Sequence, residues 1–152
     1  MDLRSAMLDD GETIGYLKKI ANILRDEIMQ HRNWVFDGNF ENFENPPLLQ
    51  FFLTHLLFGR HVHKVSGMRN DEVDKIVDAA CQFLTQNTRS DRQVHHHSKR
   101  NNEFQQTVQT PLSVGLPLSI HTRVRDKILL NNLTDVYIGC DYQRILQIEN
   151  RI

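Results

Sequence analysis

Residues 70–87 read NDEVDKIVDAACQFLTQN, and this stretch decides the fold class of the chain. Its apolar residues recur at steps of three and four, which is the spacing of one helix face. They are Val73, Ile76, Val77, Ala80, Phe83 and Leu84. Asn70 suits the N-cap, and Asp71 and Glu72 suit the positive end of the helix dipole. The stretch therefore predicts an amphipathic helix packed on a core.

Two earlier segments also predict helices. Residues 13–33 place apolar side chains at helical steps, namely Ile14, Leu17, Ala21, Leu24 and Ile28. Residues 48–58 are apolar nearly all round, after a Pro pair that suits a helix start and before Gly59, which suits a helix end. A helix of that kind should be central in the packing. We therefore expect one core to contain Leu49, Phe52, Leu53, Leu56, Ile76, Val77, Ala80 and Leu84.

The segment between these two helices reads WVFDGNFENFENPP and predicts a connecting loop. Its Asp-Gly step, its asparagines and its Pro pair all interrupt the helical spacing. We expect its four aromatic residues, Trp34, Phe36, Phe40 and Phe43, to hold this loop against the core.

Residues 110–152 read TPLSVGLPLSIHTRVRDKILLNNLTDVYIGCDYQRILQIENRI. The apolar spacing predicts one helix from about residue 118 to residue 133, a break near Gly139, and a second helix capped by Asp141. Ile145, Ile148 and Ile152 still share a helix face where the sequence stops, so we expect the chain to continue in a longer parent.

The predicted fold class is all-α. We expect an irregular bundle of about five helices with a long polar loop before the last two. Residues 1–87 would form an N-terminal helical part, residues 88–111 a polar linker or loop, and residues 112–152 a C-terminal helical hairpin that is truncated.

Composition bounds the class of protein. The chain has 152 residues, about one domain, and its N-terminus MDLRSAMLDDGE lacks the apolar region of a signal peptide. The longest apolar run, residues 46–59, is too short to span a bilayer. We therefore expect an intracellular protein, nuclear or cytoplasmic, with no membrane partner. The two cysteines, Cys81 and Cys140, have no metal-ligand spacing, and we expect no disulfide between them.

The net charge of -1 hides an asymmetry between the two parts of the chain. Residues 1–88 hold 9 basic and 13 acidic residues, whereas residues 89–152 hold 9 basic and 6 acidic ones. A basic excess of this kind can meet phosphates or an acidic partner. The candidate nucleic-acid-binding residues are Arg89, Arg92, Lys99, Arg100, Arg123, Arg125, Lys127 and Arg144.

No catalytic or metal-binding motif stands out. A zinc site needs about four ligands of fixed geometry, and the consecutive histidines His95, His96 and His97 do not supply it on a regular helix. In an extended loop His95 and His97 could face one ion, so metal binding there stays open. The sequence contains no GxSxG, HExxH or glycine-rich phosphate motif. We expect no catalytic residue, no cofactor and no enzyme.

The tail has the outline of a helix-turn-helix, with Arg123, Arg125 and Lys127 on the first helix and Arg144 on the second. An ordinary helical hairpin fits the same pattern. Residues 110–152 also resemble a segment of long open reading frames that occur in many copies in animal genomes and look derived from mobile elements. The matching positions are Thr110, Pro111, Leu112, Gly115, Leu116, His121, Arg125, Leu129, Leu133, Tyr142 and Ile145.

The resemblance extends upstream to about residue 46 and implies a context, since this family has no agreed activity. Where the family tends to have a Leu-Gly step, this chain has Leu133 and Thr134, with its glycine later at Gly139. The function we expect is a non-catalytic helical domain of a mobile-element-like protein that contributes to nucleic-acid binding or assembly. The alternative is a helical protein-interaction module with no nucleic-acid role.

Overall fold

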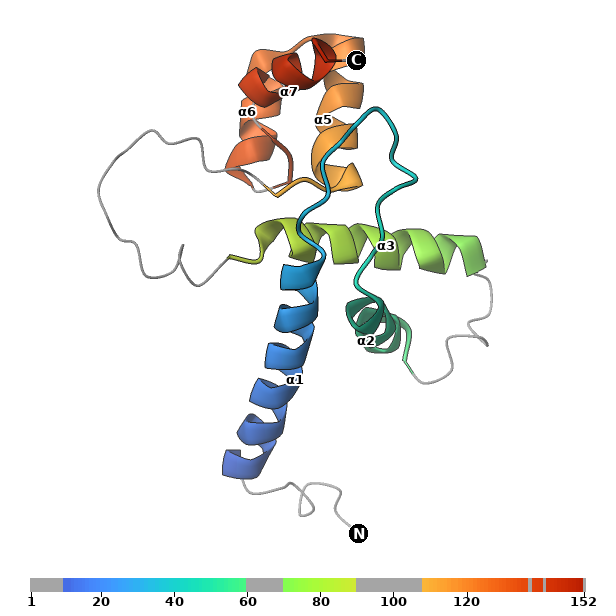
Figure 1. Cartoon of the computed structure of the whole chain (residues 1–152), viewed down its shortest axis with the longest axis vertical. Coiled ribbons are helices and arrows are strands. Elements are labelled where there is room, and N and C mark those ends of the chain that lie inside the picture. The colour runs from blue at the N-terminus through green and yellow to red at the C-terminus, as the bar shows by residue number, and fades with distance from the viewer. Residues whose placement is uncertain (1–9, 60–69, 90–107, 137, 141, 152) are drawn as a thin grey trace, which may run out of the picture.

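The computed structural model describes residues 10–59, 70–89, 108–136, 138–140 and 142–151 (Figure 1). Within these ranges the chain forms six α-helices and no strand, which confirms the all-α class. The helices are α1 (Asp10–Gln30), α2 (Pro47–Phe58), α3 (Asn70–Asn87), α5 (Pro111–Val124), α6 (Lys127–Asp135) and α7 (Tyr142–Glu149). The sequence predicts about five helices, and the additional one lies in the tail.

Helices α1, α2 and α3 pack around a first core. Its buried residues are Ile28, Leu49, Leu53, Val73, Val77 and Cys81. The start of α2 is fixed to α1 by Glu27, whose two carboxylate oxygens accept hydrogen bonds from the backbone N–H groups of Leu48 (2.9 Å) and Leu49 (3.0 Å). A carboxylate at a helix N-terminus satisfies donors that have no partner within the helix and favours the positive end of the dipole.

The predicted core is half wrong. Leu49, Leu53 and Val77 are buried and Ala80 packs against them, as expected. Four other members are exposed: Phe52, Leu56, Ile76 and Leu84. The physical reason is that, among the described helices, α2 packs against α1 and α3 on one side only. The apolar residues on its other side therefore stay exposed.

The loop after α1 runs past α3 to the group formed by α5, α6 and α7 and then returns to α2 (Figure 1). Its aromatic rings form one cluster, with centroid distances of 4.5 Å between Phe36 and Phe40 and 5.5 Å between Trp34 and Phe43. Trp34 and Phe36 also pack against a second core made by Val114, Cys140, Ile145 and Ile148. The expected attachment of the loop to the core is therefore confirmed for Trp34 and Phe36. Through these two residues, the loop after α1 packs against residues of α5 and α7.

Helix α5 begins with a complete capping box. Thr110 Oγ1 accepts a hydrogen bond from the Ser113 N–H (3.1 Å), and Ser113 Oγ accepts one from the Thr110 N–H (2.9 Å). Thr110 is fully buried, and its hydroxyl donates to Gln86 Oε1 on α3 (2.9 Å). Gln82 Oε1 on α3 accepts the Leu112 N–H (2.7 Å). These bonds join the two cores through α3.

The tail differs from the sequence prediction at two points. Helix α5 begins at Pro111 and not near residue 118, because the Thr110 cap and a first-turn proline start it. The predicted single helix is divided at Arg125, which adopts a left-handed conformation (φ 52°), and at Asp126, whose carboxylate accepts the N–H groups of Ile128 and Leu129 to start α6. The tail therefore has three described helices where the sequence predicts a hairpin of two.

Pro117 lies inside α5 because a distant backbone group replaces the hydrogen bond that it cannot donate. Proline has no N–H for the carbonyl four residues earlier, which here belongs to Ser113. The Cys140 N–H donates to that carbonyl at 3.2 Å. The backbone at Cys140 can come this close to α5 only because the preceding residue, Gly139, is glycine. A Cβ on Gly139 would lie 2.5 Å from Pro117 Cγ.

We predict that Leu53→Ala lowers the free energy of unfolding by about 2 to 5 kcal/mol, the usual cost of truncating a buried leucine. Leu53 is 6% exposed, whereas Ile128 on α6 is 72% exposed. The control Ile128→Ala should change stability by less than about 0.5 kcal/mol. Urea unfolding measures both, and equal losses would contradict the burial of Leu53.

We predict that Gly139→Ala destabilises the chain by about 1 to 3 kcal/mol, as expected when a methyl group is forced into a filled site. The neighbouring atom belongs to a proline ring, which cannot rotate away. Gly15→Ala is the control, because a Cβ there meets nothing within 4 Å, and a helical Gly→Ala change should stabilise by roughly 0.5 to 1 kcal/mol. Thermal unfolding of the two variants should therefore shift in opposite directions.

Candidate functional site

The structure separates the predicted basic residues. Arg92, Lys99 and Arg100 lie outside the described residues, as do the histidines His61, His63, His95, His96 and His97. Arg89 is exposed after α3, and its backbone carbonyl accepts a hydrogen bond from Arg25 Nη2 (2.6 Å). Of the remaining four candidates, Arg123, Lys127 and Arg144 lie on the last three helices, and Arg125 lies between α5 and α6.

Arg123, Arg125 and Lys127 lie together where α5 turns into α6, and we call them the basic corner. All three are exposed. The Arg125 N–H closes α5 by donating to the His121 carbonyl (3.0 Å). Asp126 is the one acidic residue among them, and its carboxylate caps α6. Three positive charges thus lie within five consecutive residues at the surface.

Tyr142, the residue of α7 that lies beside the basic corner, and Arg144 lie on different faces of that helix. Lys127 Nζ lies 5.9 Å from the centre of the Tyr142 ring, and Arg144 follows two residues later, about 200° round the helix. The predicted first helix of the helix-turn-helix outline is also divided at Arg125, so Arg123 and Lys127 lie on different helices. Arg144 instead lines a cavity together with residues from the end of α1.

This cavity has a volume of about 430 Å³. Three segments that are far apart in the sequence line it. They contribute Met29 in the last turn of α1 with Arg32, Asn33, Trp34 and Val35 after it, Val108 and Gln109 before α5, and Arg144 on α7. We call it the two-arginine cavity. A smaller hollow of about 150 Å³ adjoins it and shares Val35, Gln109 and Arg144.

Arg32 is half-buried at the edge of this cavity. Its Nη1 lies 3.2 Å from the sulfur of Met29, a weak acceptor, and its buried Nε has no hydrogen-bond partner. Burial, together with the charge of Arg25, lowers the pKa of Arg32. The sequence did not point to Arg32, since a single arginine near the end of a helix has no distinctive spacing.

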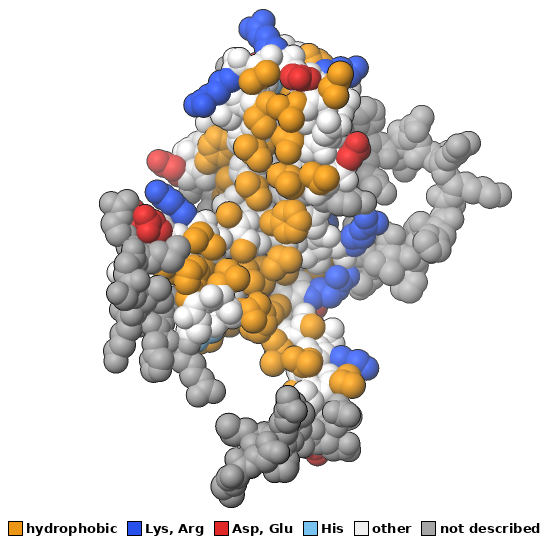
Figure 2. All heavy atoms as spheres, turned by 180° about the vertical axis from the view of Figure 1, so that it is seen from behind, with side chains coloured by type: hydrophobic (Ala, Val, Ile, Leu, Met, Phe, Trp, Pro, Cys, Tyr) orange, Lys and Arg blue, Asp and Glu red, His pale blue; other side chains and the backbone are white. Residues whose placement is uncertain are grey.

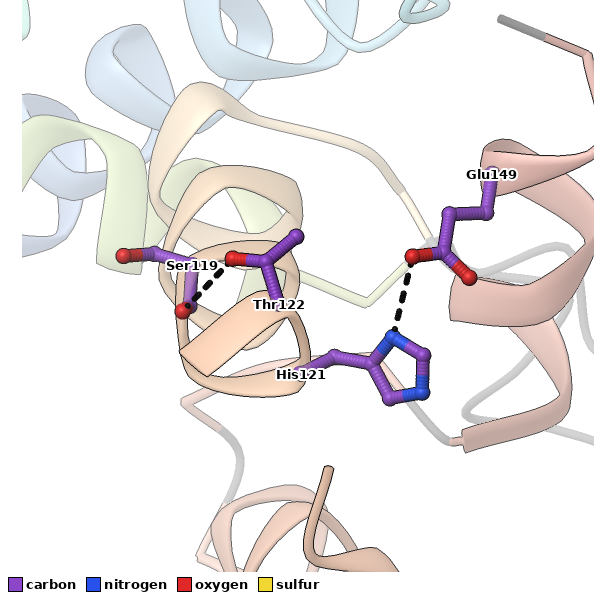
Figure 3. Close-up of polar contacts among 4 residues, drawn as sticks. All are labelled: Ser119, His121, Thr122 and Glu149. Atoms are coloured by element: carbon purple, nitrogen blue, oxygen red, sulfur yellow. Dashed lines mark hydrogen bonds and ion pairs between the residues drawn. The ribbon is translucent and has the colours of Figure 1, made fainter. Parts of the chain in front are cut away.

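A buried histidine connects α5 to α7. His121 Nδ1 lies 3.2 Å from Glu149 Oε1 (Figure 3). The histidine ring also meets the Tyr142 ring edge-on, with 5.3 Å between the ring centroids. A catalytic dyad would need a nucleophile beside the ring. The nearby hydroxyl of Thr122 instead bonds the Ser119 carbonyl within its own helix (Figure 3). The pair therefore serves to hold α7 against α5.

The two cysteines are free and buried, each in a different core. Burial, with the charges of Asp78 and Glu27, raises the pKa of Cys81 to about 12. The thiolate is the reactive form of cysteine. Cys81 is thus a packed thiol and not an activated nucleophile.

Among the described residues, no group of three or more His, Cys, Asp or Glu side chains is placed to hold a metal ion. No helix in the described part of the chain is both long and apolar enough to cross a membrane.

Many of the exposed residues of α1 and α2 are apolar. On α1 the exposed apolar residues are Ile14 (51%), Tyr16, Leu17 (61%), Ile20 and Ile23, and on α2 they are Leu48, Phe51, Phe52, Leu56 and Leu57. Figure 2 shows hydrophobic side chains gathered along the middle of one face, down to the projecting helix α1. Exposed apolar surface beyond a few scattered residues usually marks an interaction site.

No protein-family model, curated protein or solved structure matched the chain. The candidate sites therefore rest on the geometry alone.

Proposed function

We propose that this chain is a non-catalytic helical assembly domain that pairs with a second copy of itself through the apolar face of α1. The supporting observation is that this face continues, without interruption, from the packed half of the helix into the exposed half. Leu24 and Ile28 belong to the first core, whereas Ile14 and Leu17 on the same face are exposed.

The spacing on this face favours another helix as the partner. Ile14, Leu17, Ala21, Leu24 and Ile28 follow each other at steps of three, four, three and four. That is the a and d pattern of a coiled-coil seam, in which apolar knobs fit the holes of a facing helix. Figure 1 shows the N-terminal half of α1 extending away from the other helices, so a facing helix has access.

A second copy would supply the same seam. In a two-fold interface the same surface patch of each copy meets. Each copy would therefore place the apolar face of its α1 against that of the other copy. The exposed residues of α2 would enlarge the interface, because α1 and α2 are neighbours in the first core. The mobile-element context and the intracellular location stay predictions from the sequence.

We predict that the full chain forms dimers and that Leu17→Gln weakens them at least roughly tenfold, because each dimer would lose two buried leucines at about 1.5 to 3 kcal/mol each. Sedimentation equilibrium over a range of concentrations measures the dissociation constant. Asn22→Gln, on the polar face of α1, is the control and should leave it unchanged.

Thermal unfolding separates assembly from folding. Leu17 is 61% exposed, so Leu17→Gln should not unfold the monomer. A chain that is monomeric at every concentration would contradict self-assembly and favour an interaction module for a different protein.

A second candidate function is contact with nucleic acid, and the basic corner supports it. Its three exposed side chains present positive charge at one place, and Lys127 adjoins the aromatic ring of Tyr142. Arginine and lysine side chains bind phosphate groups, and aromatic rings can stack on bases. With no base-reading residue assigned, the contacts would be mainly to phosphate.

We predict that the triple change Arg123→Gln, Arg125→Gln and Lys127→Gln flattens the salt dependence of any nucleic-acid binding by about three, because each lost phosphate contact lowers the slope by nearly one. Filter binding at several salt concentrations measures the slope. The control with the same loss of charge is Lys18→Gln, Lys19→Gln and Lys75→Gln, all exposed residues elsewhere. Equal slopes for the two triple variants would remove the basic corner as the site.

A further inference from the structure

One face of α1 is open along half of its length and covered along the other half. Leu17 is 61% exposed, whereas Leu24, seven residues later, packs against the first core. The direction of a side chain changes by only about 20° over seven residues of a helix, so the two leucines point to nearly the same side. The first core therefore covers, from Leu24 onward, the face that is free at Leu17.

This division limits how a second copy can pair on that face. Paired helices lie about 8 to 10 Å apart, and beside Leu24 the first core already occupies that space. In a parallel pair each residue of α1 lies level with the same residue of the other copy. The packed half of the partner's helix would then run into the first core, where α2 packs on α1. In an antiparallel pair only the two open halves overlap, and this collision does not arise.

The open half of α1 is long enough for such a pair. Residues 11–23 are all at least partly exposed, which is about 20 Å of helix at 1.5 Å per residue. Leu17 is the middle residue of this stretch. With the two-fold axis at Leu17, residue 11 of one copy lies opposite residue 23 of the other, and the overlap ends where the first core begins at Leu24.

We propose that the pairing of α1 with a second copy is antiparallel, with the two-fold axis near Leu17 and the first cores of the two copies at opposite ends of the helix pair. This inference rests on the proposed function, because it specifies how the two copies meet. The paired face is continuous with the packed face in each copy, so each chain would extend the first core of the other. Leu48, which is 50% exposed and is held beside Glu27, lies at that end of the open stretch.

Two outward-facing residues of α1 distinguish the two orientations. Lys19 and Asp26 are exposed, and because they are seven residues apart they point to nearly the same side of the helix, away from Leu17. A nitroxide label is attached to Lys19→Cys in one variant and to Asp26→Cys in another. Pulsed electron paramagnetic resonance then measures the distance between the two labels of each dimer. The native chain treated with the same reagent is the control, since its two cysteines are buried and should stay unlabelled.

The antiparallel pair predicts two different distances. Labels on the outer sides of two paired helices are roughly 20 Å apart across the pair. Lys19 lies two residues from Leu17 and Asp26 lies nine, so the paired labels are offset along the helices by about 6 Å and about 27 Å. We expect separations of about 21 Å for Lys19→Cys and about 34 Å for Asp26→Cys. A parallel pair would give roughly 20 Å at both sites.

Sedimentation equilibrium separates the orientation from the assembly itself. A dimer with equal label distances at the two sites would overturn the antiparallel arrangement and leave the proposed self-assembly intact. A chain that stays monomeric at every concentration would overturn both. If a label at one site prevents pairing, Glu12→Cys replaces that site, because Glu12 is exposed and lies seven residues before Lys19. Its expected separation is about 25 Å in the antiparallel pair.

Discussion

The hydrogen bonds between α3 and the first turn of α5 are the constraint on which the arrangement of the molecule depends. Gln82 and Gln86 bond the Leu112 N–H and the Thr110 hydroxyl, and Gln86 Nε2 also donates to the Ile138 carbonyl at 3.2 Å. Helix α3 lines the first core, whereas α5 lines the second. Because Thr110 is fully buried, an unpaired hydroxyl there would be costly, and the two cores are held in one orientation.

The position of the two-arginine cavity follows from this constraint. Arg32 follows α1, and the end of α1 belongs to the first core. Arg144 lies on α7, which packs against α5 in the second core. Neither core alone would bring the two guanidinium groups to one cavity.

Local signals in the sequence predict the helices well where the partners are close in the chain. The helix at residues 70–87 and the Pro46, Pro47 and Gly59 boundaries of α2 agree with the sequence prediction, whereas Ile76, Phe83 and Leu84 of the predicted stripe are exposed. The start of α5 was missed because Gly115 and Pro117 resemble helix breakers. The bond from the Cys140 N–H to the Ser113 carbonyl, which makes Pro117 tolerable, joins residues that only the tertiary fold brings together.

Burial and site composition were less predictable for the same reason. Because α2 is apolar nearly all round, the sequence indicates that its surface should be buried. It does not indicate whether the residues that bury it belong to this chain or to a partner. The sequence groups Arg144 with the basic residues of the tail and does not indicate that it lines a cavity with Arg32, which is far away in the sequence. Spacing along the chain identifies helix faces, whereas a cavity between segments is defined by packing.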